Sequence, residues 1–321
     1  MSTVLVTGVA GFIGSHTAVR LLDAGHQVVG ADSLSDYYAP ERKRSNLEEV
    51  LAETKHPEAF HFLHGDLRDP AFVSSAFAER PIDRVIHLAA LPGVRSSIDD
   101  PRLYYEVNLL ATLGLLEAAR DHTVENFVFA STSSVYGDTR VIPFVESDRC
   151  DRPLAPYPAS KRAAEMLGFT FHHLYGMNFT ALRFFTVYGP RGRPDMMAHR
   201  LFDSVFFERE AALYNGGEMH RDWTYVEDIV CGVAAAVERP LGYATLNLGR
   251  GEPVRLADFV AMVEETVGKP CRLVPAPRPD TDILYTWADI SKAREMLDYH
   301  PRVSAREGIR RFWEWYRAHV L

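Results

Sequence analysis

Hydrophobic residues follow two alternating patterns through the first half of the chain. Short apolar runs rich in β-branched and aromatic residues predict strands, and stretches with helical spacing of apolar positions predict helices between them. The predicted strands are residues 4–7, 27–31, 60–63, 84–88, 127–130 and 179–184, and the predicted helices are residues 12–24, 41–54, 99–120 and 158–175. Strands that alternate with helices pair in parallel through right-handed crossovers. The pattern therefore predicts an α/β fold with a doubly wound parallel sheet.

The pattern changes after Gly189. Proline and glycine become frequent, the apolar runs shorten, and helical spacing recurs at residues 196–207, 227–237, 256–267 and 304–319. We expect residues 1–189 to form a Rossmann-type domain that binds a dinucleotide. We expect residues 190–321 to form a smaller α/β part that binds the substrate. The boundary is soft, because the chain can cross back between the two parts.

Composition restricts the class of protein. The 321 residues are 47% hydrophobic, which is enough for one or two packed cores. No apolar run approaches the roughly 20 residues of a membrane span, and the first residues carry no basic segment, so we expect a cytoplasmic protein without membrane contact. The 35 Lys+Arg against 43 Asp+Glu give a net charge of −8, which argues against a nucleic-acid-binding surface. Cys150, Cys231 and Cys271 lack ligand spacing, so we expect neither disulfides nor a metal site.

Three glycines mark the turn from the first strand to the first helix. Gly8, Gly11 and Gly14 stand three residues apart, where backbone amides can approach a pyrophosphate and the helix N-terminus adds partial positive charge. Asp32 ends the second strand, where a carboxylate can bind the hydroxyls of an adenosine ribose. An aspartate there repels a 2′-phosphate, so NAD is favoured over NADP as the cofactor. The same turn supplies two further predicted cofactor-binding residues, Phe12 and Ile13.

Two more strand ends complete the expected cofactor site at the carboxyl edge of the sheet, where the adenine and the second ribose would lie. The predicted residues are Asp66 and Leu67 after the third strand, and Leu88, Ala89 and Ala90 after the fourth. The alternative for Asp66 is a turn residue. His87 is interpreted as either a ligand or a histidine packed at the strand end. Asn108 either supports this edge of the cofactor site or is an ordinary polar helix residue.

A tyrosine and a lysine form the candidate chemical site. Tyr157 and Lys161 stand four positions apart, which places both side chains on one face of a helix. A phenol has an ordinary pKa of about 10, so it is a poor base at neutral pH unless a neighbouring cation favours the phenolate. Lys161 and the positive nicotinamide of NAD⁺ provide that bias. Pro158 suits the first helical turn and predicts an extended conformation for Tyr157.

A hydroxyl-rich segment at residues 131–137 follows the fifth strand and includes Thr132, Ser133 and Ser134. Hydroxyls there can donate to and accept from a sugar oxygen while a proton moves to the tyrosine. The alternative is a Ser/Thr turn that caps its own backbone.

In combination these residues resemble a known family. The motifs are Gly8-x-x-Gly11-x-x-Gly14, Asp32, Thr132-Ser133-Ser134-Val135-Tyr136-Gly137, Tyr157-x-x-x-Lys161 and Arg183-Phe184-Phe185-Thr186-Val187-Tyr188-Gly189-Pro190. Over nearly the whole chain they look like extended short-chain dehydrogenases that modify nucleotide-activated sugars. The segments 188–196 and 221–229 are most similar to those of UDP-glucuronate 4-epimerases.

The resemblance implies a 4-epimerase with tightly bound NAD, which interconverts UDP-glucuronate and UDP-galacturonate through a transient 4-keto sugar. Dehydratases of the family carry an Asp-Glu pair after the catalytic threonine, and decarboxylases carry a glutamate at the position of Ser134, whereas this chain has Ser133-Ser134. In that mechanism Tyr157 is the general base and then the general acid. Lys161 lowers the pKa of Tyr157 and holds the nicotinamide ribose, and Thr132 bridges the substrate hydroxyl and Tyr157.

A 4-keto uronate is a β-keto acid, and it loses CO₂ most readily when the carboxylate bond is perpendicular to the carbonyl plane. An epimerase must therefore hold the carboxylate away from that geometry. We expect Ser133, Ser134, Thr186 and Arg193 to hold it, since arginine grips a carboxylate with two hydrogen bonds and hydroxyls add directional ones. The alternative for Arg193 is a solvated loop charge.

The resemblance also implies which residues bind UDP. Arg221 and Arg278 are expected at the diphosphate, and Asp282 at the uridine ribose. Arg95 is a further candidate near the diphosphate. The alternative for each arginine is a surface charge. An edge strand at residues 213–215 is expected against the uracil, with Tyr214 and Asn215 as its contacts.

Other functions stay open from the sequence alone. A 4-epimerase for a neutral sugar such as UDP-glucose and a UDP-glucuronate decarboxylase are alternatives within the family. A catalytically silent binding protein is the alternative from another class, and the presence of Thr132, Tyr157 and Lys161 argues against it. The helices predicted at 99–120 and 158–175 carry apolar faces. The corresponding pair in the family forms a four-helix bundle with a second subunit, so we expect a homodimer.

Overall fold

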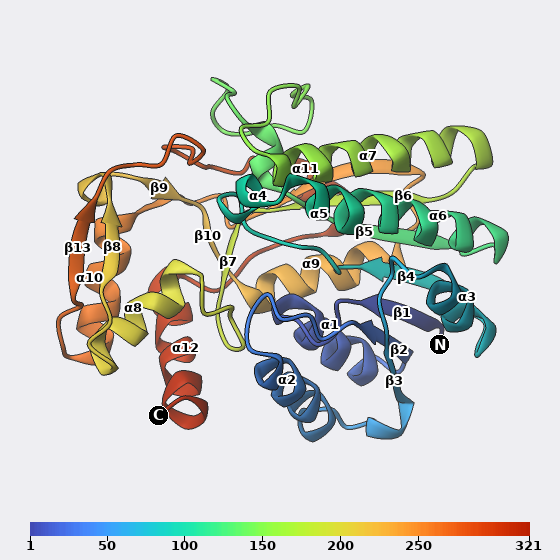
Figure 1. Cartoon of the computed structure of the whole chain (residues 1–321), viewed down its shortest axis with the longest axis horizontal. Coiled ribbons are helices and arrows are strands. Elements are labelled where there is room, and N and C mark those ends of the chain that lie inside the picture. Colours follow the sequence, from blue (N-terminus) through green and yellow to red (C-terminus); the bar gives the residue numbers. More distant parts are fainter.

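The computed structural model describes residues 1–321 and centres on a seven-stranded parallel sheet (Figure 1). The strands are β1 (Thr3–Thr7), β2 (Gln27–Asp32), β3 (Phe60–His64), β4 (Arg84–His87), β5 (Asn126–Thr132), β6 (Phe179–Phe184) and β11 (Tyr243–Leu248). Their order is β11-β6-β5-β4-β1-β2-β3, and all neighbouring strands are parallel. The order reverses between β1 and β4, which is where ligands bind at the carboxyl ends of such sheets. The predicted doubly wound α/β fold is confirmed.

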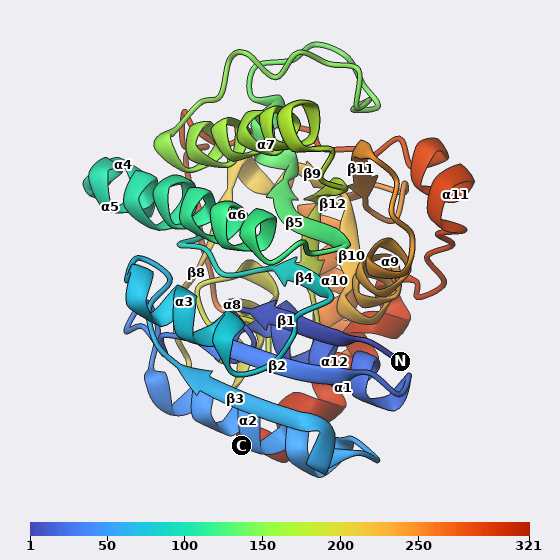
Figure 2. The same ribbon diagram turned by 90° about the vertical axis from the view of Figure 1, so that its right-hand side faces the viewer.

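Helices cover both faces of the sheet (Figure 2). One face carries α1 (Phe12–Asp23), α2 (Pro40–Glu53) and α9 (Val226–Glu238), and the other carries α3 (Pro70–Ala78), α6 (Ala111–Asp121) and α7 (Pro156–Tyr175). In β1, Leu5 belongs to the apolar cluster under α3, α6 and α7, whereas Val4 and Val6 belong to the cluster under α1 and α9. Successive side chains of a strand point to opposite faces. Burial on both sides explains why the strands are continuous apolar runs.

The helix predicted at residues 99–120 is interrupted. The segment divides into α4 (Ser96–Asp99), α5 (Pro101–Tyr105), a π-helical turn at Glu106–Leu110, and α6. The break before α5 has a local cause, because the carboxylate of Asp100 accepts the N–H of Leu103 and Pro101 begins the helix. The helical spacing of apolar residues continues through this segment, so the sequence pattern shows neither the cap of α5 nor the π-helical turn.

Two elements of this unit are absent from the sequence prediction. α3 is nine residues long, and Asp69 caps it by accepting the N–H of Ala71. β11 pairs with β6 along its whole length, from Tyr243 opposite Phe179 onward. Because α9 and β11 come after residue 189, the chain returns to the sheet from the segment expected to bind the substrate.

The rest of the C-terminal segment forms a smaller unit at one end of the sheet (Figure 1). Its helices are α8 (Met197–Phe206), α10 (Leu256–Val267) and α12 (Ala305–His319), whereas α11 (Ser291–Leu297) packs against β11 and α9 at the edge of the sheet. Three pairs of short strands are β7 (Thr186–Tyr188) with β10 (Trp223–Tyr225), β9 (His220–Arg221) with β12 (Val254–Arg255), and β8 (Ala211–Tyr214) with β13 (Leu273–Ala276). No helix of the structure combines the length and the hydropathy that a membrane span requires.

Two buried carboxylates hold the loops of this smaller unit. Asp222 is 0% exposed and accepts three backbone N–H groups, and Asp228 accepts two. The donors are Arg250, Gly251 and Ala288 for Asp222, and Arg302 and Val303 for Asp228. Loop N–H groups that are buried need such acceptors. Both aspartates of the segment 221–229 therefore have a structural role.

Candidate active site

The glycine turn between β1 and α1 leaves no room for side chains. Gly8 has a φ of 70°, and a Cβ there would lie 2.7 Å from a backbone nitrogen of the loop after β4. A Cβ on Gly14 would lie 2.1 Å from the carbonyl oxygen of Gly8. Gly11 is the N-cap of α1 and has no side chain to bond the first N–H groups, which include those of Phe12 and Ile13. The helix N-terminus is therefore open to an anion.

Asp32 stands at the end of β2 and supports the glycine turn. Its Oδ2 accepts the N–H of Ala10 at 3.0 Å, and its Oδ1 accepts the N–H of Leu34 at 2.8 Å. Burial raises the pKa of Asp32, while these N–H groups and the ammonium of Lys43 act in the opposite direction. A carboxylate has about four acceptor positions, so Asp32 retains capacity for ribose hydroxyls.

The loops after β3 and β4 flank this turn. The carboxylate of Asp66 accepts the N–H of Arg68 at 2.8 Å and pairs with its guanidinium at 2.7 Å. These hydrogen bonds lower the pKa of Asp66 and give it the turn role that was the alternative for it. After β4, the N–H of Ala89 donates to the hydroxyl of Thr7 at 3.2 Å. Four predicted residues are partly exposed along this edge, namely Leu67, Leu88, Ala89 and Ala90.

His87 is a packed histidine, the second of its two interpretations. Its Nδ1 lies 2.7 Å from the hydroxyl of Thr7, and its Nε2 lies 2.9 Å from the hydroxyl of Thr112. The ring is fully buried, and burial lowers the pKa of His87 to about 3. A neutral imidazole therefore connects β1, β4 and α6.

Asn108 supports the loop after β4 from within the π turn. Its Oδ1 accepts the N–H of Leu91 at 2.8 Å, and its Nδ2 donates to the carbonyl of Leu91 at 3.0 Å. The same Nδ2 lies 3.2 Å from the hydroxyl of Ser160 on α7. With its side chain 0% exposed, Asn108 joins this loop to the helix that carries Tyr157.

Tyr157 and Lys161 lie one turn apart on α7, beside the end of β5 that carries Thr132. The helix begins at Pro156, so the prediction of an extended Tyr157 is wrong. Pro158 occupies the third helical position, where a missing N–H costs no helical hydrogen bond. Lys161 is 2% exposed, and its Nζ lies 4.0 Å from the centre of the Phe129 ring, with no hydrogen-bond partner in the protein.

Burial and neighbouring charges determine the protonation of this pair. Burial raises the pKa of Tyr157, whereas the hydroxyl of Thr132 and the charge of Arg193 lower it. Burial lowers the pKa of Lys161 to about 7, and Glu165 acts in the opposite direction. The hydroxyl of Thr132 also caps the next turn by accepting an N–H at 3.1 Å, so both interpretations of this segment hold at Thr132. Additional positive charge beside Tyr157 is needed to form its phenolate.

The residues predicted to hold a carboxylate come from three segments. Ser133 and Ser134 are partly exposed on the 3-10 turn after β5, and Thr186 begins β7 and lines a cleft. Arg193 is partly exposed and paired, since its Nε and Nη2 each donate to the carboxylate of Asp195 at 2.9 Å. One edge of the guanidinium is thus engaged, and Nη1 remains available.

A cleft of about 420 Å³ brings most of the predicted nucleotide contacts together. Arg95 crosses it, with Nη2 2.7 Å from Oδ2 of Asp282 and Nη1 2.6 Å from the hydroxyl of Tyr214. The guanidinium also lies 4.3 Å from the centre of the Tyr214 ring. Burial lowers the pKa of Arg221 to about 10, and its Nη2 lies 3.8 Å from Asp282. The predicted residues that line the cleft are Arg95, Thr186, Tyr214, Arg221 and Asp282.

Two predicted nucleotide contacts lie at the margin of the cleft. Arg278 is exposed, and its Nη1 donates to the backbone carbonyl of Asp282 at 2.7 Å. Asn215 is exposed in the turn after β8, which ends at Tyr214, so it lies beyond the strand expected there.

The cleft also contains residues that the sequence analysis did not select, including Tyr37, Asp195, Met197, Arg200, Met219 and Trp223. Tyr37 comes from the loop after β2, and its hydroxyl lies 3.3 Å from that of Ser96. Trp223 is 3% exposed, stacks on Phe259 at 3.9 Å, and has an indole N–H without an acceptor. Asp195 and Trp223 lie in the segments 188–196 and 221–229 that carried the resemblance, whereas the sequence offered no signal for Tyr37.

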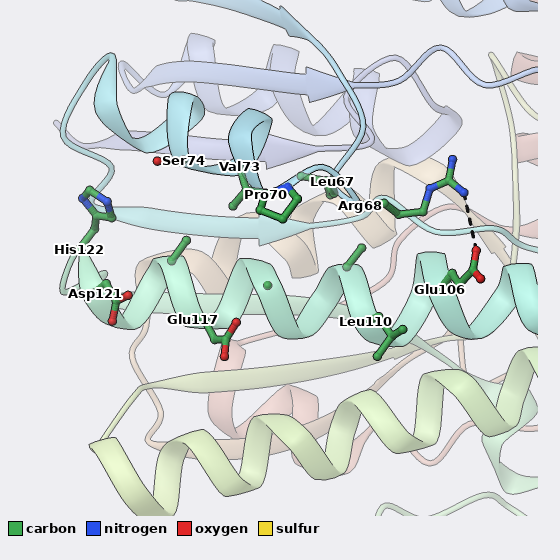
Figure 3. A pocket seen from close by; sticks show the side chains of 13 residues that line it. Leu67, Arg68, Pro70, Val73, Ser74, Glu106, Leu110, Glu117, Asp121 and His122 are labelled. Carbon is green, nitrogen blue, oxygen red and sulfur yellow. Dashed lines mark ion pairs between the residues drawn. The ribbon is translucent and has the colours of Figure 1, made fainter.

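A second hollow of about 480 Å³ lies between α3 and α6 (Figure 3). Arg68 and Glu106, which both line it, lie 3.9 Å apart, and Leu110 lies with Glu106 on the π-helical turn before α6. Leu67 is its only lining residue that was predicted for a site. The hollow and the cleft are of similar size, and Thr132, Tyr157 and Lys161 line neither, so size does not identify the chemical site.

Known proteins resemble this chain over its full length. Residues 5–312 match the family model described as GDP-mannose 4,6 dehydratase. The chain is 40% identical to the UDP-glucuronate 4-epimerase of Thermodesulfobacterium geofontis, over 100% of this chain and 98% of that protein. The UDP-glucuronic acid 4-epimerase of Bacillus cereus, in complex with UDP-glucuronic acid and NAD, has a TM-score of 0.89 and 34% identity, with 98% and 99% of the two chains covered. A UDP-glucose 4-epimerase from Thermotoga maritima with UDP-glucose also has a TM-score of 0.89, at 29% identity, with 99% and 100% covered.

Proposed function

The chain belongs to the GDP-mannose 4,6-dehydratase family of extended short-chain dehydrogenases, and from this premise we propose that it is an NAD-dependent UDP-glucuronate 4-epimerase. The family predicted from the motifs is confirmed. The enzyme interconverts UDP-glucuronate and UDP-galacturonate through a transient 4-keto sugar. The reaction has no net redox change, so NAD stays bound. The uronate epimerases are more similar in sequence than the neutral-sugar epimerase, at 40% and 34% against 29% identity.

One observation carries the proposal. Thr132 at the end of β5 is a hydrogen-bond partner of Tyr157 in the first turn of α7, and Lys161 follows Tyr157 by one turn of the same helix. Ser133 and Ser134 follow Thr132, so no carboxylic acid is in place to expel water or promote another elimination. The three side chains suffice to move one proton to and from a hydroxyl, which is what an epimerase needs.

The glycine turn and its surroundings fit NAD. The turn excludes a Cβ at Gly8 and at Gly14, as a close approach of a pyrophosphate requires. Asp32 is available to the adenosine ribose and disfavours a 2′-phosphate. Lys161 has a buried ammonium without a protein acceptor, which suits the hydroxyls of the nicotinamide ribose. Phe12, Ile13, Leu67, Leu88, Ala89 and Ala90 complete the proposed contacts, with Asp66 and Asn108 holding the loops that present them.

The proton is handled by Tyr157. Its phenolate takes the proton of the sugar 4-hydroxyl, and the phenol later returns this proton to the C4 oxygen. NAD, held by the glycine turn and Lys161, would supply the hydride chemistry at C4, with the hydride returned to the opposite face of the 4-keto sugar. Lys161 favours the phenolate through its charge, and its own pKa of about 7 leaves it partly protonated at neutral pH. Thr132 donates to the C4 oxygen of the sugar and holds it near Tyr157.

The substrate carboxylate is held by Ser133, Ser134, Thr186 and Arg193. Arg193 offers Nη1 while Asp195 fixes the other edge of its guanidinium. A bound carboxylate that cannot rotate perpendicular to the C4 carbonyl does not leave as CO₂. We place UDP in the 420 Å³ cleft, with Arg95, Arg221 and Arg278 at the diphosphate, Asp282 at the ribose, and Tyr214 and Asn215 at the uracil.

The test is NMR of UDP-glucuronate incubated with purified enzyme and no added NAD⁺. We expect the axial and equatorial H4 signals to approach an equilibrium mixture with the C6 carboxylate retained. Release of CO₂ with pentose signals would replace the proposal by a decarboxylase. Turnover of UDP-glucose but not of UDP-glucuronate would replace it by a neutral-sugar epimerase.

The enzyme acts as a homodimer through α6 and α7, which lie side by side (Figures 1 and 2). Apolar side chains are exposed on α7, with Met166 at 59% and Leu174 at 60%, and on the π-helical turn that leads into α6, with Leu110 at 58%. Two such pairs form a four-helix bundle that removes these side chains from water. Light scattering at micromolar concentration tests the assembly, and Met166→Glu should shift the mass from two chains to one.

The two parts of the chain have different roles in the proposed enzyme. Residues 1–189 supply the cofactor and catalytic residues, and residues 190–321 supply most nucleotide contacts while returning α9 and β11 to the sheet. The three free cysteines suit a reducing compartment, so we place the protein in the cytoplasm. A fluorescent fusion of the chain tests this location.

A further inference from the structure

A buried ion pair lies directly behind the catalytic lysine. Glu165 on α7 and Arg183 on β6 are 0% and 1% exposed. Two parallel hydrogen bonds join them, from Arg183 Nε to Oε1 at 2.9 Å and from Nη2 to Oε2 at 2.8 Å. The hydroxyl of Ser131 on β5 donates to Oε1 at 2.5 Å. The carboxylate thus joins α7 to the two neighbouring strands β5 and β6 in the buried interior.

Glu165 connects elements that carry the proposed catalytic residues. Glu165 follows Lys161 by one helical turn, and Lys161 follows Tyr157 by one turn, so the three share a face of α7. Ser131 immediately precedes Thr132 at the end of β5. A displacement of Glu165 therefore moves the helix that carries the base relative to the strand that carries the threonine.

The same carboxylate is the negative charge that balances a set of cations. On α7, Lys161 precedes it and Arg162 donates to its Oε2 at 3.0 Å. From β6 comes Arg183, whereas His87 on β4 is neutral because burial lowers its pKa to about 3. From the loop before α7, Cys150 is buried near the pair, and burial raises its pKa to about 12, so it carries no charge.

We propose that Glu165 is a positioning residue, which holds the turn of α7 that carries Tyr157 and Lys161 against the strand end that carries Thr132, and which places a carboxylate one helical turn from Lys161. This inference rests on the proposed function, because it gives Lys161 a role in forming the phenolate. Glu165 raises the pKa of Lys161 against the lowering by burial. Without Glu165 the lysine loses its proton at lower pH, and activity at neutral pH falls with it.

Two substitutions separate charge from placement. Glu165→Gln keeps the length of the side chain and removes its charge. The fall of kcat on the alkaline side of its pH profile should therefore begin about one pH unit lower. Glu165→Asp keeps the charge and shortens the side chain, so kcat should drop about tenfold with the position of the alkaline fall unchanged. For both variants the KM for the UDP-sugar should stay within about twofold of the parent value, since Glu165 does not contact the nucleotide. Thermal unfolding and retained NAD serve as folding controls.

Ser131→Ala is the milder variant if Glu165→Gln leaves Arg183 unpaired and does not fold. It removes one hydrogen bond without changing a charge, and we expect a severalfold loss of kcat with an unchanged pH profile. A wild-type profile and kcat for folded Glu165→Gln would overturn the inference, as would wild-type kcat for both Glu165→Asp and Ser131→Ala. A parent enzyme that turns over no UDP-sugar would instead overturn the proposed function, and the inference with it.

Discussion

Arg95 spans the nucleotide cleft and places its guanidinium against the carboxylate of Asp282, with Nη2 2.7 Å from Oδ2. The two residues are 187 positions apart in the chain, and both line the cleft. Asp282 is our candidate for the uridine ribose, and its carboxylate is already engaged. In the proposed binding mode UDP shares or displaces this ion pair, which would free Arg95 to turn toward the diphosphate.

Arg95→Ala tests this coupling. We expect the Kd of UDP to rise about tenfold, since a charge-assisted contact to a phosphate is lost. The kcat should change little, because Arg95 contacts the nucleotide and not the reacting carbon. Isothermal titration with UDP measures the first effect. Arg102→Ala, an exposed arginine on α5, is the matched control, and equal affinities for the two variants would remove Arg95 from the binding site.

Tyr157→Phe should lower kcat by about 10³-fold, since it removes only the group that carries the proton. The ring remains, with its edge-to-face packing on Tyr104 at 6.3 Å, so stability and UDP affinity should be unchanged. Initial rates from coupled assays or NMR give the loss of kcat. Residual activity within a few fold of the parent would mean that another group is the base.

Weaker binding of the substrate carboxylate should change the product of the reaction as well as its rate. In Arg193→Ala the uronate keeps only its hydroxyl donors, so we expect a pentose product from lost CO₂ beside the epimer. Asp195→Asn leaves Arg193 in place with a weaker support and should give less pentose than Arg193→Ala. NMR of the product mixture measures the ratio, with Arg272→Ala as a surface control. Unchanged affinity and an unchanged product ratio in Arg193→Ala would contradict its assignment.

A methyl group at Gly14 should abolish cofactor retention. Gly14→Ala places a Cβ 2.1 Å from the carbonyl oxygen of Gly8, so the turn must open. We expect purified Gly14→Ala to lack the absorbance of bound NAD, whereas Gly114→Ala in α6, where a Cβ meets nothing within 4 Å, should retain it. Normal NAD content in Gly14→Ala would show that the pyrophosphate is bound elsewhere.

His87 makes stability fall in acid. Its pKa of about 3 in the folded chain lies below the ordinary value of 6.5, so between these values the unfolded chain binds a proton that the folded chain excludes. The free energy of unfolding therefore rises with pH across this window, by up to about 1.4 kcal/mol per pH unit, and is lost as pH falls. His16, with a pKa lowered to about 4, acts in the same direction.

Urea unfolding at pH 4 to 7 measures this slope. We expect a shallower dependence on pH in His87→Gln than in the parent, whereas the exposed His300→Gln should keep the parent slope. Parallel lines for the parent and His87→Gln would mean that the histidine is protonated in the folded state.

The sequence predicts the sheet well, because its strands are buried on both faces and stand out as apolar runs. It does not predict α3, whose nine residues are too short for a clear helical period, or β11, which lies far from its partner β6 in sequence. The π turn around Asn108 depends on hydrogen bonds to Leu91, and no local pattern encodes it.

Some residues of the candidate site could likewise be predicted from the sequence, and others could not. Residues tied to strand and helix ends, such as Gly8, Thr132 and Lys161, could be located from spacing alone. Partners could not be located, because Asp195 beside Arg193 and Asp282 beside Arg95 depend on loop conformations. For the same reason the sequence left Asp66 and His87 with two interpretations each, which only their hydrogen-bond partners could separate.

The return of α9 and β11 to the sheet limits how such a protein can be recombined. A chimera that exchanges everything after residue 189 for the segment of a relative would import a foreign edge strand, and β6 would have to pair with it across six residues. A mismatch there leaves a bare strand edge, which invites aggregation. New sugar specificity is therefore easier to acquire by exchanging the loops around the cleft than by exchanging the C-terminal segment as a block.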